Sequence, residues 1–186
     1  MARKAQQEIT HRTSFNPIIG DDPTTLILGL APSENYIEQG QYYASPNDCL
    51  WEALAQFLRV PSNFPTTAYT TKLFLLKNHG IALWDILHEY QRTGATNKDI
   101  VKVPSYNDIP KLLTKFPTIE NIIFNGKDTY TFFKRYILAT YPNNTNIKRF
   151  LKKNIITVQS TAARTEADRD KILDEWQKKV APLFTK

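Results

Sequence analysis

The sequence predicts an α/β fold, with three layers (α/β/α) around a short, mainly parallel sheet of four strands. Two patterns in the sequence support this prediction. Short and almost wholly apolar runs recur along the chain. Such runs are typical of strands that are buried on both faces, as in parallel sheets. Segments with apolar residues at helical spacing lie between the runs, and this alternation favours a parallel sheet covered by helices on both faces.

The four candidate strands are the runs TTLILG, IALWDIL, IIF and NIITVQS, which begin at Thr24, Ile81, Ile122 and Asn154. A helix is expected over residues 50–58, because its apolar residues have the spacing of one buried face and Pro61 stops the pattern. A second helix is expected before the IALWDIL run, with Gly80 as its C-cap. Two more helices are expected, one after the NG turn that follows the third run and one after the TAART segment.

The 186-residue chain is predicted to form one domain, residues 21–186, preceded by a polar N-terminal arm, residues 1–20. No apolar run approaches the roughly 18 to 20 residues of a membrane span, and the first residues lack the apolar core of a signal peptide. We therefore expect an intracellular protein without membrane association. In a bacterium or archaeon it would be cytoplasmic and nucleoid-associated, and in a eukaryote it would be nuclear.

The composition argues against several kinds of chemistry and favours a polyanionic partner. Cys49 is the only cysteine, and the three histidines have no metal-ligand spacing, so we predict no metal. Neither the GxGxxG nor the GxxxxGK[ST] pattern is present, which argues against nucleoside-triphosphate chemistry. The formal net charge of +6 favours a partner such as nucleic acid.

Four polar or aromatic segments follow the candidate strands, and they are where a site is expected. In an open α/β sheet, ligands bind outside the carboxyl ends of the strands. These ends carry LAPSENYIEQGQYYASPND, WD at residues 84–85, NGK at residues 125–127 and QSTAART at residues 159–165. We therefore expect residues from all four segments to contribute to one site.

These segments resemble the uracil-DNA glycosylase superfamily, most closely its DNA-deoxyinosine (hypoxanthine-DNA) glycosylase branch. The resemblance rests on LILGLAPSENYIEQGQYYASPNDCLW, LLKNHGIALWDIL, IIFNGKDTYTFFKRY and VQSTAARTEADRDKILDEW, which occur in family order between Thr24 and Trp176. It implies a three-layer α/β/α domain that flips a damaged base out of DNA and cleaves its bond to the deoxyribose without a metal or cofactor.

The resemblance also implies which residues bind the base. Tyr43 matches the aromatic residue that stacks on the flipped base, and the alternative is that it is a core tyrosine. Tyr42 is expected to be structural, because alternation turns one side chain in and one out. Asp85 matches the position that contacts the base edge, where a carboxylate could accept a hydrogen bond from a ring N–H; the alternative is a cap for a following helix. Leu30 and Ala31 complete the expected base-binding set.

Asp48 is the expected catalytic residue. The resembled branch usually has P-x-N before the helix, and Asp48 stands in place of that asparagine. A carboxylate beside the sugar can stabilise the positive charge that develops as the N-glycosidic bond breaks, and it can orient the attacking water. Three alternatives stay open: Asn47 is the functional residue after a one-residue shift, Asp48 only caps the helix that starts near Cys49, or the change marks a lost or altered reaction.

The expected DNA-binding residues are Ser33, Ser160, Thr161, Arg164 and Lys127. The QSTAART segment matches the family's S-T-S-P-A-N motif without its prolines, and its hydroxyl and backbone N–H groups could bind a phosphate. Arg164 could bind a phosphate or enter the gap left by the flipped base. Lys127 stands at a helix start, a common place for phosphate contacts. For both cations, an exposed surface charge is the alternative.

The sequence therefore predicts a monomeric, monofunctional DNA glycosylase that acts on deaminated bases, hypoxanthine first and uracil second, in single- or double-stranded DNA. Lys127 is the only lysine in the four segments, so a Schiff-base lyase step has little support and the expected product is an abasic site. Two alternatives remain open. One is a catalytically silent DNA-binding or protein-interaction module on the same fold, and the other is a glycosylase retuned to another modified base.

Overall fold

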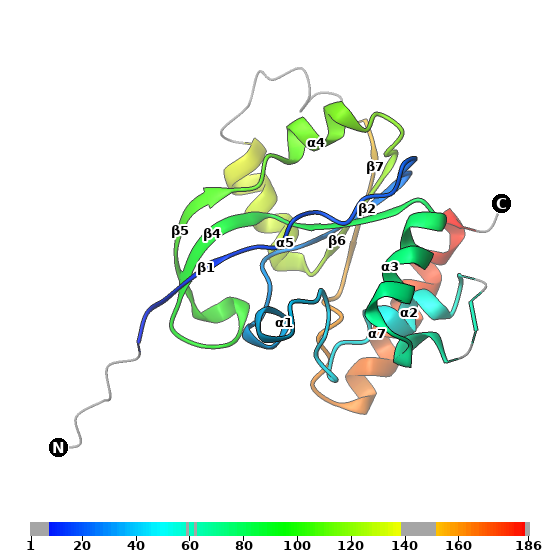
Figure 1. Cartoon of the computed structure of the whole chain (residues 1–186), viewed down its shortest axis with the longest axis horizontal. Coiled ribbons are helices and arrows are strands. Elements are labelled where there is room, and N and C mark those ends of the chain that lie inside the picture. The colour runs from blue at the N-terminus through cyan, green and yellow to red at the C-terminus, as the bar shows by residue number, and fades with distance from the viewer. Residues whose placement is uncertain (1–7, 59, 62, 139–151, 185–186) are drawn as a thin grey trace.

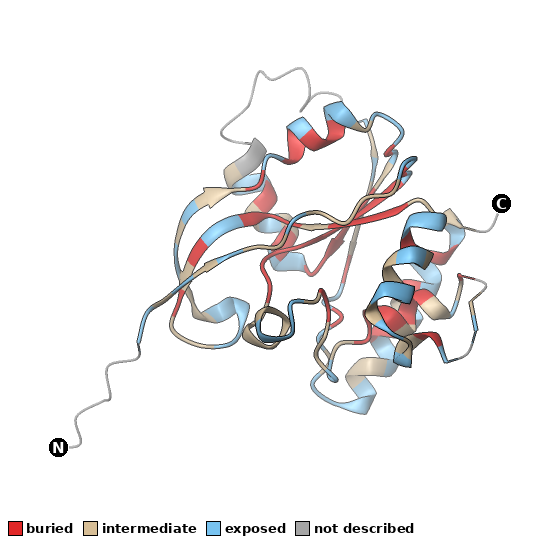
Figure 2. Ribbon diagram, viewed as in Figure 1, coloured by how far each residue is buried: buried red, intermediate tan, exposed pale blue. Residues whose placement is uncertain are grey.

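A four-stranded parallel sheet forms the centre of the molecule. The computed structural model describes residues 8–58, 60–61, 63–138 and 152–184. Its main sheet has the strand order β3-β2-β6-β7, with β2 (Thr25–Gly29), β3 (Ile81–Asp85), β6 (Asn121–Asn125) and β7 (Asn154–Val158) all parallel (Figure 1). Every residue of β2 is buried, and the central strands are accordingly red in Figure 2. The predicted parallel sheet is confirmed.

Helices cover both faces of this sheet, which makes the three layers. Ile27 and Ile123 pack on one face against α2 (Leu50–Ala55), α3 (Tyr69–Asn78) and α7 (Glu166–Lys179). The alternate residues Leu26 and Leu28 pack on the other face against α4 (Ile109–Lys115) and the helical stretch formed by α5 (Lys127–Phe132) and the π-helical turn η3 (Phe133–Leu138). Because successive side chains of a strand point to opposite faces, one short strand supplies both cores.

A second sheet, which the sequence did not predict, lies beside the first. It has the order β1-β4-β5, with β1 (Thr10–Thr13), β4 (Leu87–Arg92) and β5 (Ile100–Tyr106) all antiparallel. The expected N-terminal arm therefore contains a strand, in which Thr10 pairs with Arg92 and Thr13 with Glu89. The sequence of β1 is polar and carries no apolar run, because its residues are only half-buried or exposed in the fold.

Short elements connect these layers. They are α1 (Glu34–Gln39) and the 3-10 turns η1 (Phe64–Thr66), η2 (Asn97–Asp99) and η4 (Ala181–Leu183). Gly80 follows α3 with a φ of 65°, the left-handed conformation that glycine favours at a helix end. Among the described residues, no helix combines the length and the apolar character that crossing a bilayer needs.

Candidate active site

The carboxyl ends of the four parallel strands bring the predicted loops together. The loop after β2 and the loop after β7 are joined by backbone hydrogen bonds: Cys49 N–H donates to the Thr161 carbonyl (2.9 Å), and Ala163 N–H donates to the Asn47 carbonyl (2.9 Å). Arg169 of α7 adds a bond to the Pro46 carbonyl (3.2 Å). The segment around Asp48 is therefore fixed from two sides before any ligand binds.

Asp48 is half-buried, and each of its carboxylate oxygens has one hydrogen-bond donor. Oδ2 accepts from the Tyr36 hydroxyl (2.6 Å), and Oδ1 accepts from the Leu50 N–H (2.9 Å) at the start of α2. Burial raises the pKa of Asp48, and these two donors oppose the rise. The predicted capping contact is therefore present, but it occupies only one oxygen. Asn47 is exposed and contributes its backbone carbonyl to the loop.

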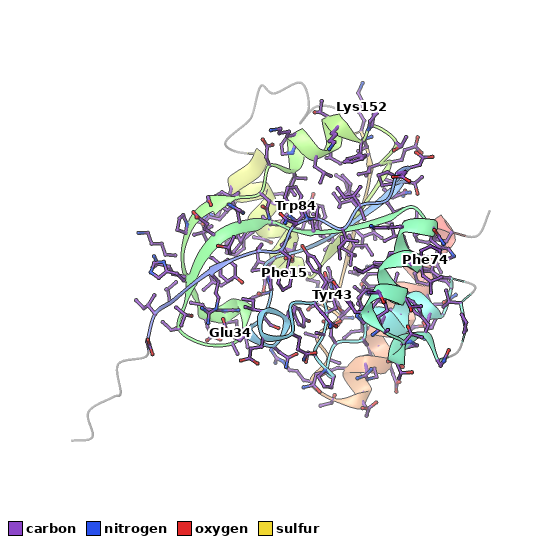
Figure 3. The ribbon with its side chains drawn as sticks, in the orientation of Figure 1. Phe15, Glu34, Tyr43, Phe74, Trp84 and Lys152 are labelled. Carbon is purple, nitrogen blue, oxygen red and sulfur yellow. The ribbon has the colours of Figure 1, made fainter. Side chains whose placement is uncertain are left out.

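Tyr43 does not follow the predicted alternation, because Tyr42 and Tyr43 are both buried. Tyr42 and Tyr43 lie in a turn, and the φ of Tyr43 is 54°, a left-handed conformation that places its side chain inside beside that of Tyr42. The Trp51 indole N–H holds the strained peptide by donating to the Tyr43 carbonyl (3.1 Å). Figure 3 shows Tyr43 at the centre of the molecule, next to α1.

Asp85 is buried at the end of β3, and its Oδ2 has no hydrogen-bond partner among the described residues. The Tyr43 hydroxyl is also buried and makes no hydrogen bond of normal geometry within the described part of the chain, although the nearby Asn125 side chain lowers its pKa. Both side chains approach Gly29, where an added Cβ would overlap Asp85 Oδ1 and lie 3.2 Å from the Tyr43 hydroxyl. The helix-cap alternative for Asp85 is wrong, because strand β4 rather than a helix follows at Leu87.

Burial raises the pKa of Asp85 to about 7. Taking an ionised carboxylate out of water is unfavourable unless a donor or a cation compensates. Unpartnered buried polar atoms are rare in folded proteins and call for an explanation. A carboxylate and a phenol that lack partners at the end of a parallel sheet have the properties of a ligand-recognition pair.

Thr161 is fully buried, which corrects its prediction as a phosphate contact. Its hydroxyl accepts a hydrogen bond from the Asn125 side-chain amide (2.8 Å), and its N–H donates to the Asn125 side-chain oxygen (2.9 Å). This reciprocal pair joins the end of β6 to the loop after β7. Sequence reasoning treated Asn125 only as a turn residue, and the position after a buried strand was the one available sign of its role.

Three predicted DNA-binding residues do come together. Lys127, Ser160 and Arg164 line one open cavity of about 490 Å³, beside Asn125 and Gly126. Lys127, Ser160 and Arg164 were each predicted separately from different parts of the sequence, and the end of the sheet places them on one surface. Asp128 and Asp168 line the same cavity, so its lining carries charges of both signs. Within it, Lys127, Arg164 and the Ser160 hydroxyl are the groups suited to contact a phosphate backbone.

The other predicted residues lie in the loop directly after β2. Leu30 and Ala31 are buried in the core between the sheet and α4. Ser33 is the N-cap of α1, where its hydroxyl accepts from the Tyr36 N–H (3.4 Å), and it is not among the residues that line the groove. Tyr36 was missed by sequence reasoning, because nothing in its spacing indicates a contact with Asp48.

The fold and these strand-end loops define a class of protein. The family model of the uracil DNA glycosylase superfamily matches residues 17–181. The chain belongs to this superfamily and is a DNA N-glycosylase.

Individual proteins of known name or structure are also similar to this chain. Two proteins called hypoxanthine DNA glycosylase, from Methanosarcina acetivorans and Methanosarcina barkeri, are each 30% identical, over 116 and 117 residues. Each match spans 62% of this chain and 72% of the relative. A solution NMR structure of a Methanosarcina acetivorans protein, titled as a candidate uracil DNA glycosylase, has a TM-score of 0.75 and 23% identity over 95% of this chain and 100% of that one. This last likeness supports the fold.

Proposed function

We propose that this DNA glycosylase removes hypoxanthine from DNA, and uracil less efficiently, by hydrolysis after base flipping. The observation that carries the proposal is the buried Asp85 carboxylate, whose Oδ2 has no partner among the described residues. The names of the two Methanosarcina relatives support the choice of hypoxanthine. Base flipping is needed because the target bond is out of reach inside a duplex.

Asp85 would recognise the base through its ring N–H. The Watson–Crick edge of hypoxanthine offers a ring N–H donor beside a carbonyl acceptor, and uracil offers the same pair on a smaller ring. Adenine offers a ring nitrogen acceptor at the corresponding place, which an ionised carboxylate repels. The unpartnered Tyr43 hydroxyl supplies a donor near the same spot, and its ring offers a stacking surface worth roughly 1 to 3 kcal/mol.

Asp48 would act on the sugar. As the bond between C1′ and the base nitrogen breaks, its electron pair leaves with the base and positive charge develops on the sugar. The Asp48 carboxylate stabilises that charge and orients a water whose oxygen forms the new bond to C1′. The water loses one proton as it bonds to C1′ and the departing base takes up one, so the hydrolysis balances and leaves an abasic site with a hydroxyl at C1′. Lys127 is the only lysine in the strand-end loops and lies in the groove, so no lyase step is proposed.

The groove would bind the DNA backbone while the protein acts as a monomer. Lys127 and Arg164 supply the cations and Ser160 a hydroxyl donor. Because Asp85 Oδ2 and the Tyr43 hydroxyl are both covered in the free protein, insertion of the base requires the loop that carries Tyr43 to shift. The strained φ of Tyr43 is consistent with a loop that has a second arrangement.

The test is base release from oligonucleotides that carry hypoxanthine, uracil, xanthine or only normal bases, followed by alkaline cleavage of abasic sites. We expect release of hypoxanthine by the wild type and a loss on the order of 100-fold or more in Asp48→Ala. The matched control is Asp108→Ala, which removes another capping carboxylate, bonded to the Lys111 N–H (2.9 Å), from α4.

Each contrary result has a defined meaning. Equal release by the wild type and Asp48→Ala removes Asp48 from the mechanism. No release from any substrate, together with retained salt-sensitive DNA binding, replaces the proposed activity with that of a silent DNA-binding module. Release of xanthine alone would keep the enzyme class and change the base.

A further inference from the structure

We infer that Tyr36, on α1, is a positioning residue that holds the Asp48 carboxylate ionised and in one orientation for the reaction. The inference rests on the proposed function and assigns a role to a residue outside the predicted site. It concerns a single side-chain contact between two segments that the sequence separates by twelve positions.

The geometry fixes the carboxylate completely. The Tyr36 hydroxyl lies 2.6 Å from Oδ2, a length typical of a bond from O–H to an ionised oxygen. The Leu50 N–H lies 2.9 Å from Oδ1. Because the two donors come from α1 and α2, rotation of the carboxylate would break at least one bond. The Thr161 side chain also lowers the pKa of Asp48, and the lone pairs that these donors leave free would accept from the water and face the sugar.

The phenol acts as a donor at neutral pH. Burial and the negative charge of Asp48 raise the pKa of Tyr36 far above 10, so the hydroxyl keeps its proton. Its ring also packs against Tyr43, with ring centroids 5.7 Å apart. Replacement by phenylalanine therefore removes the hydrogen bond and keeps most of the packing.

The antiparallel sheet holds α1 in place, which gives that sheet a role in the site. Glu34, the first residue of α1, accepts two bonds from Arg12 Nε and one from Arg12 Nη2 (2.7 Å), on β1. The buried Arg92 of β4 lies 3.4 Å from the same carboxylate and donates to the Pro32 carbonyl (2.9 Å). The loop that leads into α1 is thus tied to both neighbouring strands.

Loss of the Tyr36 hydroxyl would make Asp48 easier to protonate. Burial raises the pKa of Asp48, and the Tyr36 bond is the largest effect that lowers it. The other charged or titratable groups near Asp48 are Arg169 from α7, which favours its ionised form, and its loop neighbours Tyr43 and Cys49. Since the proposed reaction needs ionised Asp48, activity falls as pH drops through the pKa of Asp48. Protonation of Asp85, whose pKa is about 7, adds a second step that the wild type and the Tyr36 variant share.

The test compares Tyr36→Phe with Tyr42→Phe. The control removes a buried hydroxyl that lies 3.4 Å from the Phe15 carbonyl and makes no bond to Asp48. We expect the acid limb of the single-turnover rate to move up by about one pH unit in Tyr36→Phe, the size set by one hydrogen bond to a charge. The limb of Tyr42→Phe should coincide with that of the wild type.

A second measurement does not depend on activity. The carboxyl ¹³C resonance of Asp48, followed by NMR against pH in the free protein, should titrate at higher pH in Tyr36→Phe than in the wild type. An active wild type with unshifted limb and titration in Tyr36→Phe overturns the inference and leaves the proposed function intact. A wild type that releases no base overturns the proposed function, and the positioning role falls with it.

Discussion

At the scale of single residues, Asp85 combines burial with an oxygen that lacks a partner among the described residues. Its place at a strand end, together with the resemblance to the superfamily, predicts that Asp85 reads the base edge, and this role stays a prediction. The effect of the Asp85 carboxylate on stability could not be predicted from the sequence, because it depends on the groups that surround the carboxylate in the fold. Tyr36 was unpredictable for the same reason, since its partner is set by the path of the loop.

Asp85→Asn should make the protein more stable at alkaline pH. Burial raises the pKa of Asp85 from 3.8 to about 7, so the folded state holds this proton more tightly than the unfolded state does. The tighter binding of this proton adds to the free energy of unfolding. The contribution is complete below about pH 4 and is lost as pH rises through about 7. The amide avoids that loss, which amounts to up to about 4 kcal/mol.

Urea unfolding at pH 4 and pH 8 measures this effect. The gain of Asp85→Asn should be large at pH 8 and small at pH 4. The exposed cap Asp108 offers the control variant Asp108→Asn, for which we expect little difference between the two pH values. An equal increase in the free energy of unfolding at both pH values would contradict the raised pKa of Asp85, because it would show that the fold compensates the charge of the carboxylate.

At the scale of elements, the parallel strands were predictable and the antiparallel strands were not. The residues of β2 are all buried and form one apolar run. In contrast, β1 alternates half-buried and exposed positions, β4 mixes exposed and buried ones, and the β4–β5 pairing is irregular. The loops could be assigned to one end of the sheet, but the bonds that join them could not. The Asn125–Thr161 pair is the clearest case, because neither residue suggests the other.

Thr161→Val should destabilise the protein by about 1 to 3 kcal/mol. The variant keeps the shape of the side chain but leaves the Asn125 amide N–H without its acceptor in a buried position. Thr131→Val is the control, because the exposed Thr131 hydroxyl only bonds back to the Lys127 carbonyl within α5 (3.0 Å). Chemical denaturation of the two variants measures the difference, and equal stabilities would contradict the structural role of the pair.

At the scale of the whole molecule, the net charge of +6 follows directly from the composition, whereas the arrangement of the cations on the surface depends on the fold. The sequence could not separate cations that bind a partner from those that pair internally. Lys127 and Arg164 line the groove, while Lys178 pairs with Asp174 (2.7 Å) one turn away on α7. The fold therefore divides chemically similar side chains into two groups with different expected effects on DNA binding.

Lys127→Gln and Arg164→Gln should each weaken DNA binding and reduce the slope of log affinity against log salt by about 1. Each removes one phosphate contact and the counterion release that goes with it. Lys178→Gln is the control, and its salt slope should match that of the wild type. Binding titrations between low and moderate salt measure the slopes, and three identical slopes would place the DNA elsewhere on the surface.

Gly29 has a consequence for related sequences. A side chain at this position would overlap Asp85 Oδ1 and crowd the Tyr43 hydroxyl, so the carboxylate is compatible only with a bare backbone opposite it. Glycine at one strand end and aspartate at the next should therefore vary together across homologous chains. A chain that gains alanine at position 29 should also have exchanged its aspartate at position 85, and with it the base that it accepts.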